Sequence, residues 1–383
     1  MTMKQDKHFP GNQIKKDQGI RINVPLVRNF NFKRNIKQFT TGSNGILYNI
    51  FSKLTEVYMN AREIRETAGA FQKSRIILTA FELDIFTFLA EKSYSAKDIS
   101  KAIDLDERAA EKLLNALTAL NLLEKENEKF KNTAESFKYL SKSSPEYMSG
   151  LGHSNHLWDT WSQLTDVVKE GEPAHEEEIN ERGDEWLNAF IHAMHYRGKI
   201  QAPAHVSKID LDNVGSVLDV GGGSGVFLMS FLERKPELKA AVFDLPNVLP
   251  ISKKIVKEEG YEGKIEHYEG DFTKDELPKG FDMIFLSAII HGNSYDTNKD
   301  LVKKCHKALN SKGKIVIQDW IMDDSKTKPV QGALFSINML VGVEGGDCYS
   351  ESEVKSWLDN AGFTNMKITG LEAGLGQVVA EKE

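Results

Sequence analysis

A short apolar segment that runs into a glycine-rich loop is the feature that most constrains the fold of this chain. Residues 216–220 (Ser-Val-Leu-Asp-Val) have the composition of a buried strand, four glycines follow within five residues, and residues 226–233 have helical periodicity. Glycine accepts a positive φ and lets a ligand approach the backbone closely, so a strand, glycine loop and helix in this order are typical of a nucleotide-type cofactor site. The sequence therefore predicts an α/β domain that binds its cofactor at this loop.

The spacing of the glycines distinguishes between cofactors. A dinucleotide fingerprint needs a third glycine at the position of Val226, whereas this loop reads G-x-G-x-G from Gly221 and follows an acid at Asp219. A cofactor without a pyrophosphate does not need an open helix N-terminus. We therefore expect Asp219, Gly221 and Gly223 to bind S-adenosylmethionine (SAM), whose amino-acid end offers an ammonium and a carboxylate.

Further polar signals follow the next predicted strands. A second apolar segment ends at Asp244, about 20 residues past the glycines, where a carboxylate can bind both ribose hydroxyls. Asp271 and Phe272 follow a third strand and suit the edge and face of an adenine, and His291 lies just past a fourth. Ligands of open α/β sheets bind outside the carboxyl ends of the strands, so we expect these side chains to meet at one edge.

The C-terminal part of the chain continues this alternation of strands and helices. A regular β-α-β pattern from residue 214 onward predicts a mostly parallel sheet that is covered on both faces. The remaining predicted elements are strands at 265–268, 281–286, 314–320, 366–369 and 376–380 and helices at 294–309 and 350–361.

The N-terminal half is predicted to be helical. Apolar periodicity and capping residues predict the following elements: helices at 46–58, 71–89 (one helix or a close pair), 95–100 and 106–120, then short strands at 122–125 and 129–132. Helices followed by a strand pair form a winged-helix pattern, which raises a DNA-binding regulator as an alternative. However, the candidate recognition helix, residues 107–117, has nearly balanced charges, so DNA binding is the weaker interpretation.

Between these halves, residues 146–208 are rich in aromatic residues and histidine. Helices are predicted near 155–170 and 184–199. Aromatic and Met side chains at helical spacing usually pack in a core, but a connector that adjoins a cofactor domain is also well suited to cover an apolar substrate pocket.

Charge and composition narrow the functional classes. The net charge of −7 is uneven, because the residues before Asn44 carry +7 and the remainder therefore carries −14. An acidic body argues against a nucleic-acid partner, and we expect the basic residues 1–45 to be a solvated, poorly ordered extension. There is no apolar run of about 18 residues, no apolar leader, only two cysteines, and no Cys/His spacing typical of zinc. These features predict a cytoplasmic protein with no metal site and no membrane partner.

Together the motifs resemble the metal-independent, SAM-dependent small-molecule O-methyltransferases, a family that includes caffeate-type, acetylserotonin and bacterial enzymes. The resemblance covers residues 46–383 and depends on these segments: Leu218-Asp-Val-Gly-Gly-Gly-Ser-Gly, Phe243-Asp-Leu-Pro, Gly270-Asp-Phe, Thr79-Ala-Phe-Glu-Leu-Asp-Ile-Phe and Leu113-Leu-Asn-Ala-Leu. It implies a Rossmann-like class I methyltransferase domain with a seven-stranded sheet at residues 209–383. It also implies a winged-helix dimerisation domain at 46–145, which pairs with a second subunit instead of binding DNA.

The resemblance also implies site residues. His291 matches the family's general base and Asp319 one of the carboxylates beside it. The SAM ligands correspond to Gly221, Asp244, Leu245, Asp271 and Phe272, and the substrate-facing positions to Trp186, Phe190, Met194 and Met339. The chain departs from the family at three positions: Gly292 replaces the acid after the base, Cys348 replaces the second carboxylate, and Ser287 replaces a basic cofactor-binding residue on the fourth strand. At that position we expect Ser287 to be a cofactor-binding residue.

These features predict a homodimeric methyltransferase that acts on a hydroxyl of a small aromatic molecule and releases S-adenosylhomocysteine (SAH). Two alternatives remain open. The same fold could methylate nitrogen, carbon or sulfur, and a family member could bind SAM without transferring its methyl group. The sequence does not specify the acceptor.

Overall fold

The computed structural model describes residues 58–174 and 183–383, and the chain divides into two compact units, residues 1–68 and 69–383. In the first unit the described residues are 58–68, most of which belong to helix α2 (Ala61–Gly69), where Arg62 Nε lies 2.6 Å from Glu66 Oε1. The basic segment 1–45 and nearly all of the predicted helix 46–58 lie outside the described residues. The second unit contains every element discussed below.

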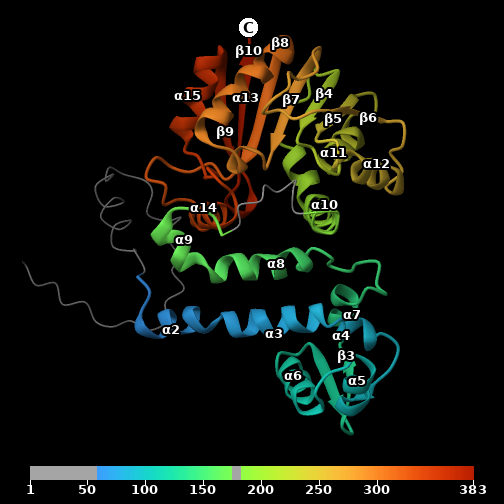
Figure 1. Cartoon of the computed structure of the whole chain (residues 1–383). Coiled ribbons are helices and arrows are strands. Elements are labelled where there is room, and N and C mark those ends of the chain that lie inside the picture. The colour runs from blue at the N-terminus through green and yellow to red at the C-terminus, as the bar shows by residue number, and fades with distance from the viewer. Residues whose placement is uncertain (1–57, 175–182) are drawn as a thin grey trace, which may run out of the picture. The chain divides into compact units, whose positions relative to one another are not determined.

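The second unit contains a seven-stranded sheet that is packed between helices (Figure 1). Its strands are β4 (Ser216–Val220), β5 (Lys239–Asp244), β6 (Ile265–Glu269), β7 (Phe281–Ser287), β8 (Leu309–Asp319), β9 (Phe363–Gly370) and β10 (Gly376–Lys382). Their spatial order is β6-β5-β4-β7-β8-β10-β9. All neighbouring pairs are parallel except those of β10, which is antiparallel to both β8 and β9. The prediction of a mostly parallel sheet is confirmed.

Strand β4 lies in the interior of this sheet, and all five of its residues are buried. Its partner Cα positions run from Ser216 opposite Lys239 to Val220 opposite Phe243 on β5, and Asp219 lies opposite Phe285 on β7. A strand with both faces covered needs apolar side chains on both, which explains why β4 is apolar apart from Ser216 and Asp219.

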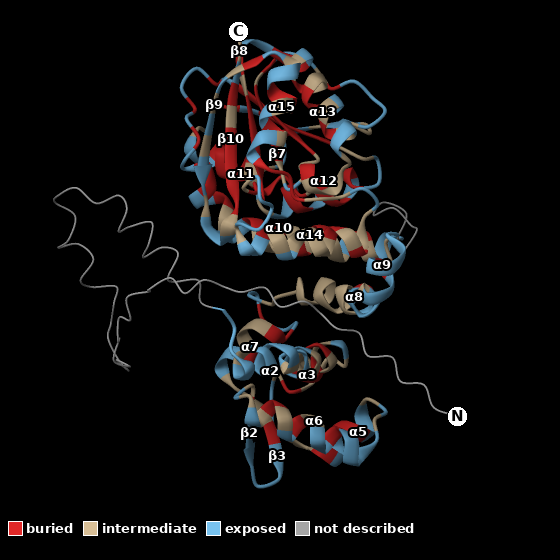
Figure 2. Ribbon diagram, turned by 90° about the vertical axis from the view of Figure 1, so that its left-hand side faces the viewer, coloured by how far each residue is buried: buried red, intermediate tan, exposed pale blue. Residues whose placement is uncertain are grey.

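Helices cover both faces of the sheet, and Figure 2 shows the buried residues concentrated along the strands. One core cluster joins Leu218 and Val220 to Trp357, and the other joins Val217 to Phe231. The covering helices are α11 (Val226–Arg234), α12 (Leu249–Glu258), α13 (Tyr295–Ala308) and α15 (Glu351–Ala361). The helices predicted at 294–309 and 350–361 are present as α13 and α15, and the structure adds that Ser294 and Ser350 are their N-caps.

The N-terminal part of the second unit has the predicted helices and strand pair. It consists of α3 (Phe71–Glu82), α4 (Ile85–Phe88), β1 (Tyr94–Ser95), α5 (Ala96–Ala102), α6 (Glu107–Ala119), β2 (Leu123–Glu126), β3 (Lys129–Asn132) and α7 (Ala134–Leu140). Ser95 and Asp98 form a capping box on α5, and Asp106 caps α6 by accepting from the Ala109 N–H. The segment 71–89 is a close pair of helices, and β2 and β3 pair antiparallel.

Four further helices adjoin the sheet and the N-terminal part. They are α8 (Leu151–Ser162), α9 (Leu164–Glu170), α10 (Asp184–Val206) and α14 (Val330–Gly342). α10 extends seven residues beyond its predicted end, and α14 was not predicted. Within the described residues, no helix combines the length and the apolar composition needed to cross a bilayer.

Helices α10 and α11 approach each other closely at Gly198. A Cβ built on Gly198 would overlap Cγ1 of Val226, the first residue of α11. Because Val226 is β-branched and buried, its side chain cannot rotate freely out of the way. Gly198 therefore sets how near α10 lies to the helix that follows the glycine loop.

We expect Gly198→Ala to lower the free energy of unfolding by up to about 2 kcal/mol, because an overpacking cost of roughly 1–3 kcal/mol outweighs the helix-propensity gain of about 1 kcal/mol. In a Val226→Ala background the same substitution should be neutral or stabilising, since the opposing methyl groups are gone. Urea unfolding of the four proteins of this double-mutant cycle measures both effects. Equal effects of Gly198→Ala in the two backgrounds would contradict the close approach.

Candidate active site

The glycine loop between β4 and α11 is held by the carboxylate of Asp244, the last residue of β5. Asp244 Oδ2 accepts a hydrogen bond from the Gly223 N–H at 2.8 Å, and Oδ1 accepts one from the Leu245 N–H at 2.8 Å. Gly221, Gly223 and Gly225 have φ values of +67°, +53° and +73°, which L side chains rarely adopt. The loop and the end of β5 therefore form one hydrogen-bonded unit that requires glycines.

Two carboxyl groups lie at this loop, Asp219, which is buried, and Asp244, which is partly buried. Asp219 is 2% exposed, and its burial, together with the nearby charge of Asp244, raises its pKa well above the ordinary value. Burial raises the pKa of Asp244 to about 6, although its two backbone hydrogen bonds act in the opposite direction. Hydroxyl or ammonium donors would stabilise the ionised forms of both groups. The ribose and the amino-acid end of SAM carry such donors, so the residues present fit this cofactor.

The predicted adenine-binding residues follow β6. The Phe272 ring lies near Gly221, with its Cε1 atom 4.0 Å from the position of a Cβ there. The Asp271 carboxylate instead forms a turn: Oδ1 accepts from the Thr273 N–H at 2.9 Å and Oδ2 lies 2.9 Å from Lys274 Nζ. Phe272 is therefore brought to the loop, whereas the Asp271 side chain is engaged within its own segment.

Ser287, at the end of β7, belongs to a polar chain that crosses the sheet. Its hydroxyl accepts from Gln318 Nε2 at 3.0 Å, and Gln318 Oε1 accepts from Gln377 Nε2 at 2.9 Å. Gln318 and Gln377 are both buried. In this structure Ser287 thus links β7 to β8 and has no recorded bond to the glycine loop.

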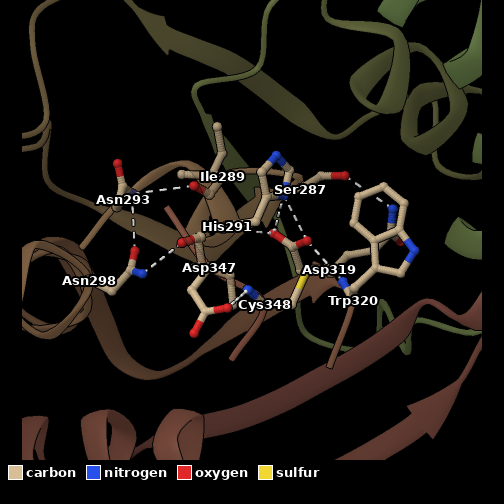
Figure 3. Close-up of polar contacts among 11 residues, drawn as sticks. Ser287, Ile289, His291, Asn293, Asn298, Asp319, Trp320, Asp347 and Cys348 are labelled. Carbon is tan, nitrogen blue, oxygen red and sulfur yellow. Dashed lines mark hydrogen bonds and ion pairs between the residues drawn. The ribbon is translucent and has the colours of Figure 1, made fainter. Parts of the chain in front are cut away.

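His291 and Asp319 form a hydrogen-bonded pair at the carboxyl ends of β7 and β8 (Figure 3). His291 lies in the short 3₁₀ turn η4 (Ile290–Gly292), and its Nδ1 is 2.8 Å from Asp319 Oδ1 and 3.0 Å from Oδ2. The Asp319 side chain is 1% exposed, and its Oδ1 also accepts from the Trp320 N–H. An ionised carboxylate at Nδ1 selects the tautomer that is protonated there. The lone pair of Nε2 is then available, and Nε2 points away from Asp319 in Figure 3.

Buried amides hold the backbone that carries His291. The fully buried Asn298 donates from Nδ2 to the Ile290 carbonyl at 2.7 Å, and its Oδ1 accepts from Asn293 Nδ2 at 3.0 Å. The His291 carbonyl accepts from the Asp347 N–H at 3.0 Å. The 3₁₀ turn is therefore fixed by polar contacts on both sides, and so is the direction of the imidazole.

The structure shows the surroundings of Gly292 and Cys348, two of the positions at which the chain departs from the family pattern. A Cβ on Gly292 would meet nothing within 4 Å, so this position faces open space. Cys348 is 1% exposed, and burial raises the pKa of its thiol to about 12, which keeps the thiol neutral. The neighbouring Asp347 carboxylate pairs with Lys326 Nζ at 2.8 Å. Asp319 is thus the carboxylate that bonds to the His291 ring among the residues that the structure describes.

Two aromatic residues that were not predicted lie beside the imidazole. Phe335 of α14 meets His291 edge-on with ring centroids 4.9 Å apart, and Trp320 stacks on Phe335 at 3.7 Å. The sequence did contain signals for both. Trp320 directly follows Asp319, and Phe335 lies one helical turn before the predicted substrate residue Met339.

The predicted substrate residues fall into two groups. Trp186 and Phe190 on α10 stack at 5.1 Å, and His153 of α8 meets both rings edge-on. Met339 is buried on α14. A Cβ at Gly346 would be 3.3 Å from Met339 Cβ and 2.8 Å from the His291 carbonyl, so Met339 lies near the His291 backbone.

Met194 is half-buried on α10, and the structure records no contact between it and His291. Its neighbour His195, which was predicted only as part of the aromatic connector, ties α10 to the glycine loop. His195 Nδ1 lies 3.1 Å from Ser224 Oγ, and Nε2 lies 3.3 Å from Glu259 Oε1. Burial lowers the pKa of His195, so the ring is held in its neutral form. The helix that carries the aromatic pair is therefore bonded directly to the cofactor loop.

The sheet has seven strands, of which β10 is antiparallel to its neighbours. The glycine loop follows β4, and the acid Asp244 ends β5. These features define a class I SAM-dependent methyltransferase. Comparison with protein-family models identifies the family within this class. Residues 161–364 match the O-methyltransferase domain model and residues 65–142 match the O-methyltransferase dimerisation domain model. The chain belongs to the O-methyltransferase family and, like its relatives, uses SAM.

Individual proteins agree with this assignment. A 3-hydroxy-5-methyl-1-naphthoate 3-O-methyltransferase from Streptomyces sahachiroi is 30% identical over 79% of this chain and 90% of its own. The N,N-dimethyltransferase OxyT from Streptomyces rimosus is 28% identical over 84% of this chain and 96% of its own. Human N-acetylserotonin methyltransferase, solved in complex with SAM, superposes with a TM-score of 0.74 at 25% identity, covering 86% of this chain and 99% of that one.

We expect SAM affinity to fall as the pH is lowered below about 6, approaching tenfold per pH unit, because burial raises the pKa of Asp244 to about 6 and its protonated form is a much weaker acceptor for the ribose hydroxyls. The cofactor favours the ionised carboxylate, so its binding opposes protonation. Calorimetric titrations between pH 7.5 and 5 measure the dependence, with circular dichroism to verify folding. The dependence should be much weaker in Asp244→Asn. An affinity that does not change over this range would refute the role of Asp244.

Proposed function

We propose that this enzyme transfers the methyl group of SAM to a hydroxyl of a small aromatic molecule and that His291 is the general base. The observation that carries the proposal is the hydrogen bond between His291 Nδ1 and Asp319, at the sheet edge where the glycine loop and Asp244 also lie. It engages Nδ1 and leaves Nε2 as the ring nitrogen without a bond to Asp319. A phenolic hydroxyl is a weak nucleophile until its proton is removed. A neutral imidazole held in one orientation provides that proton acceptor.

Each residue of the pair has a distinct part in the proposed mechanism. SAM, when bound, supplies a methyl group that is activated by the positively charged sulfur. His291 Nε2 accepts the proton of the acceptor hydroxyl as the oxygen becomes nucleophilic. Asp319 retains its hydrogen bond to Nδ1–H, prevents rotation of the ring and stabilises the imidazolium that forms. The amides of Asn298 and Asn293 maintain the position of the ring, which matters because positioning supplies much of the rate of a displacement of this kind.

The proposed cofactor site consists of the glycine loop and the residues around it. Asp244 accepts from the ribose hydroxyls, Asp219 lies with Gly221 and Gly223 on the side of the amino-acid end, and Leu245 and Phe272 provide apolar contact for the adenosine. Asp271 accepts from Thr273 and Lys274, and its Oδ2, which has Lys274 as its partner, can accept a further hydrogen bond from the adenine edge. Ser287 accepts a hydrogen bond from Gln318, and its O–H remains the donor that it would offer to the cofactor.

An aromatic acceptor is supported by the residues near the base. The Trp320–Phe335 stack lies against His291, Met339 lies near its backbone, and Trp186 and Phe190 provide a second stacked pair on α10. We accordingly divide the chain into an N-terminal domain at 46–145, a connector at 146–208 whose described helices are α8, α9 and α10, and a SAM-binding domain at 209–383. The relative from Streptomyces sahachiroi acts, by its name, on a hydroxyl of a naphthoate.

Methylation of nitrogen is the second candidate. It is favoured by one relative, which is named an N,N-dimethyltransferase. An amine that is already neutral needs no base before it attacks the methyl group. Dependence of the rate on His291 therefore distinguishes the two reactions.

We expect His291→Gln to lower turnover of a phenolic acceptor by roughly 10²–10⁴-fold, because the amide cannot accept the proton. Screening phenols and hydroxylated heteroaromatics with radiolabelled SAM identifies an acceptor and measures the rate. SAM affinity should stay within about threefold of wild type, since the ring bonds to Asp319 and not to the glycine loop. If the variant retains near wild-type turnover, the base assignment fails and N-methylation becomes the better hypothesis.

We also propose that the enzyme is a homodimer. The dimerisation-domain match at residues 65–142 supports this, and so do large apolar side chains that are exposed on adjoining helices. Phe71 on α3 is 55% exposed and Val168 on α9 is 63% exposed, while α8 contacts both helices. Exposed apolar patches of this kind mark association surfaces.

Light scattering should give a mass of about twice 43.1 kDa at micromolar concentration. The double variant Phe71→Glu, Val168→Glu should shift the mass towards 43.1 kDa, because each carboxylate would have to be desolvated in the interface. Lys73→Glu, an exposed change on the same helix, is the matched control and should remain dimeric. A monomeric wild-type protein would exclude the homodimer.

A further inference from the structure

Arg197 lies on α10 beside the His291–Asp319 pair, and its guanidinium has no oxygen acceptor. Its Cζ is 5.2 Å from the centroid of the Trp320 ring, and Trp320 in turn lies 5.7 Å from the His291 ring. Within residues 58–174 and 183–383, no hydrogen bond or ion pair reaches the guanidinium. Contact with an aromatic ring supplies no oxygen, so the N–H donors remain free.

The nearby Asp319 does not satisfy these donors. Its oxygens accept from His291 Nδ1, from the His291 N–H and from the Trp320 N–H. Burial lowers the pKa of Arg197, and attraction to Asp319 only partly opposes this shift. The charge is therefore partly desolvated without a bonded partner, which is unfavourable in the absence of a ligand.

Two other arginines of the described chain whose guanidinium groups contact neighbouring helices or loops do form hydrogen bonds to oxygen atoms. Arg234 donates to the carbonyls of Val206 and Ile209, and Arg75 donates to Asn155 and Glu82. Arg197 differs because it is half-buried at the site and unbonded. This difference indicates that the N–H donors of Arg197 are available to a ligand.

The chemistry of guanidinium specifies the ligand. Arginine presents planar, paired N–H donors that match the two oxygens of a carboxylate, and it does not lose its charge at neutral pH. We propose that Arg197 binds a carboxylate carried by the acceptor, and that the substrates of this enzyme are hydroxyaryl carboxylates. The proposal rests on the proposed function for the reaction, but carboxylate binding can be measured without methyl transfer.

Two probes of the same ring system test this proposal: 3-hydroxy-2-naphthoate and 2-naphthol, each titrated calorimetrically into the full-length protein saturated with SAH. The wild-type protein should bind the carboxylate at least tenfold more tightly than the neutral phenol. Arg197→Met, which keeps the apolar stem, should weaken carboxylate binding by about 10–100-fold, the range expected for a hydrogen bond between charged groups. Its binding of 2-naphthol should change by less than about threefold.

Two further variants distinguish the effect of the paired N–H donors of Arg197 from the effect of its positive charge. Arg197→Lys keeps the charge but not the paired donors, so it should recover only part of the carboxylate affinity. Lys208→Met removes an exposed positive charge just past the end of α10 and should bind both probes like wild type. SAH affinity of every variant reports whether the fold is intact.

Three results would overturn the inference. The first is that the wild-type protein binds the carboxylate no more tightly than 2-naphthol. The second is that Arg197→Met loses affinity for both probes equally, and the third is that this variant binds the carboxylate with full affinity. The second result would mean that Arg197 only neutralises Asp319 or supports the pocket. These results differ from a failure of the proposed function. If the enzyme does not methylate phenols, the preference for the carboxylate would be preserved but no phenol would be methylated. Conversely, methylation of neutral phenols without that preference would refute only the carboxylate site.

Discussion

The parallel pairing of β4 with β5 and β7, and of β7 with β8, is the constraint on which the site depends. Parallel neighbours end at the same edge, so residues far apart in the sequence are brought to one side of the sheet. The glycine loop follows β4, Asp244 ends β5, the turn of His291 follows β7, and Asp319 ends β8. The cofactor residues and the proposed base are therefore neighbours because of the backbone register, before any side chain adjusts.

Each functional group at this edge is then oriented by a buried polar partner. Asp244 bonds to the glycine loop, His195 bonds the same loop to α10, Asp319 selects the tautomer of His291, and Asn298 holds the turn beneath it. A buried polar group costs free energy unless its hydrogen bonds are made, so each partner has a strongly preferred arrangement. Arg197 is the exception in this set, which is why its free donors carry information about the acceptor.

The sequence predicted those parts of the fold and site that depend on short-range patterns. The strand at 216–220 appears with the predicted bounds, and Ser95 and Asp106 cap helices where the spacing placed them. Local spacing was enough because strand ends, caps and glycine turns are determined by adjacent residues. The dimeric state, the base and the acceptor remain predictions.

The parts that were missed depend on tertiary packing. The spacing of Phe335 to Met339 gives only a weak signal that the helix at 330–342 presents Phe335 to His291, and nothing around Arg197 shows that its guanidinium contacts Trp320. Likewise, the turn that engages Asp271 with Thr273 and the bond from Gln318 to Ser287 occur in segments whose sequence also fits direct cofactor contact. Periodicity identifies a helix face but not the residues from other helices that meet it.

Helix α10 has a consequence for how enzymes of this architecture diversify. It is anchored near its middle by the bond of His195 to Ser224 and by the close approach of Gly198 to Val226, while Trp186, Phe190 and Arg197 project from other positions on the same rigid rod. The residues that anchor the helix, His195 and Gly198, differ from those proposed to contact the acceptor, Trp186, Phe190 and Arg197. Substitutions at the latter can change which molecules are accepted over evolutionary time while the cofactor loop keeps its position, so new acceptors can be acquired without rebuilding the methyl-donor site.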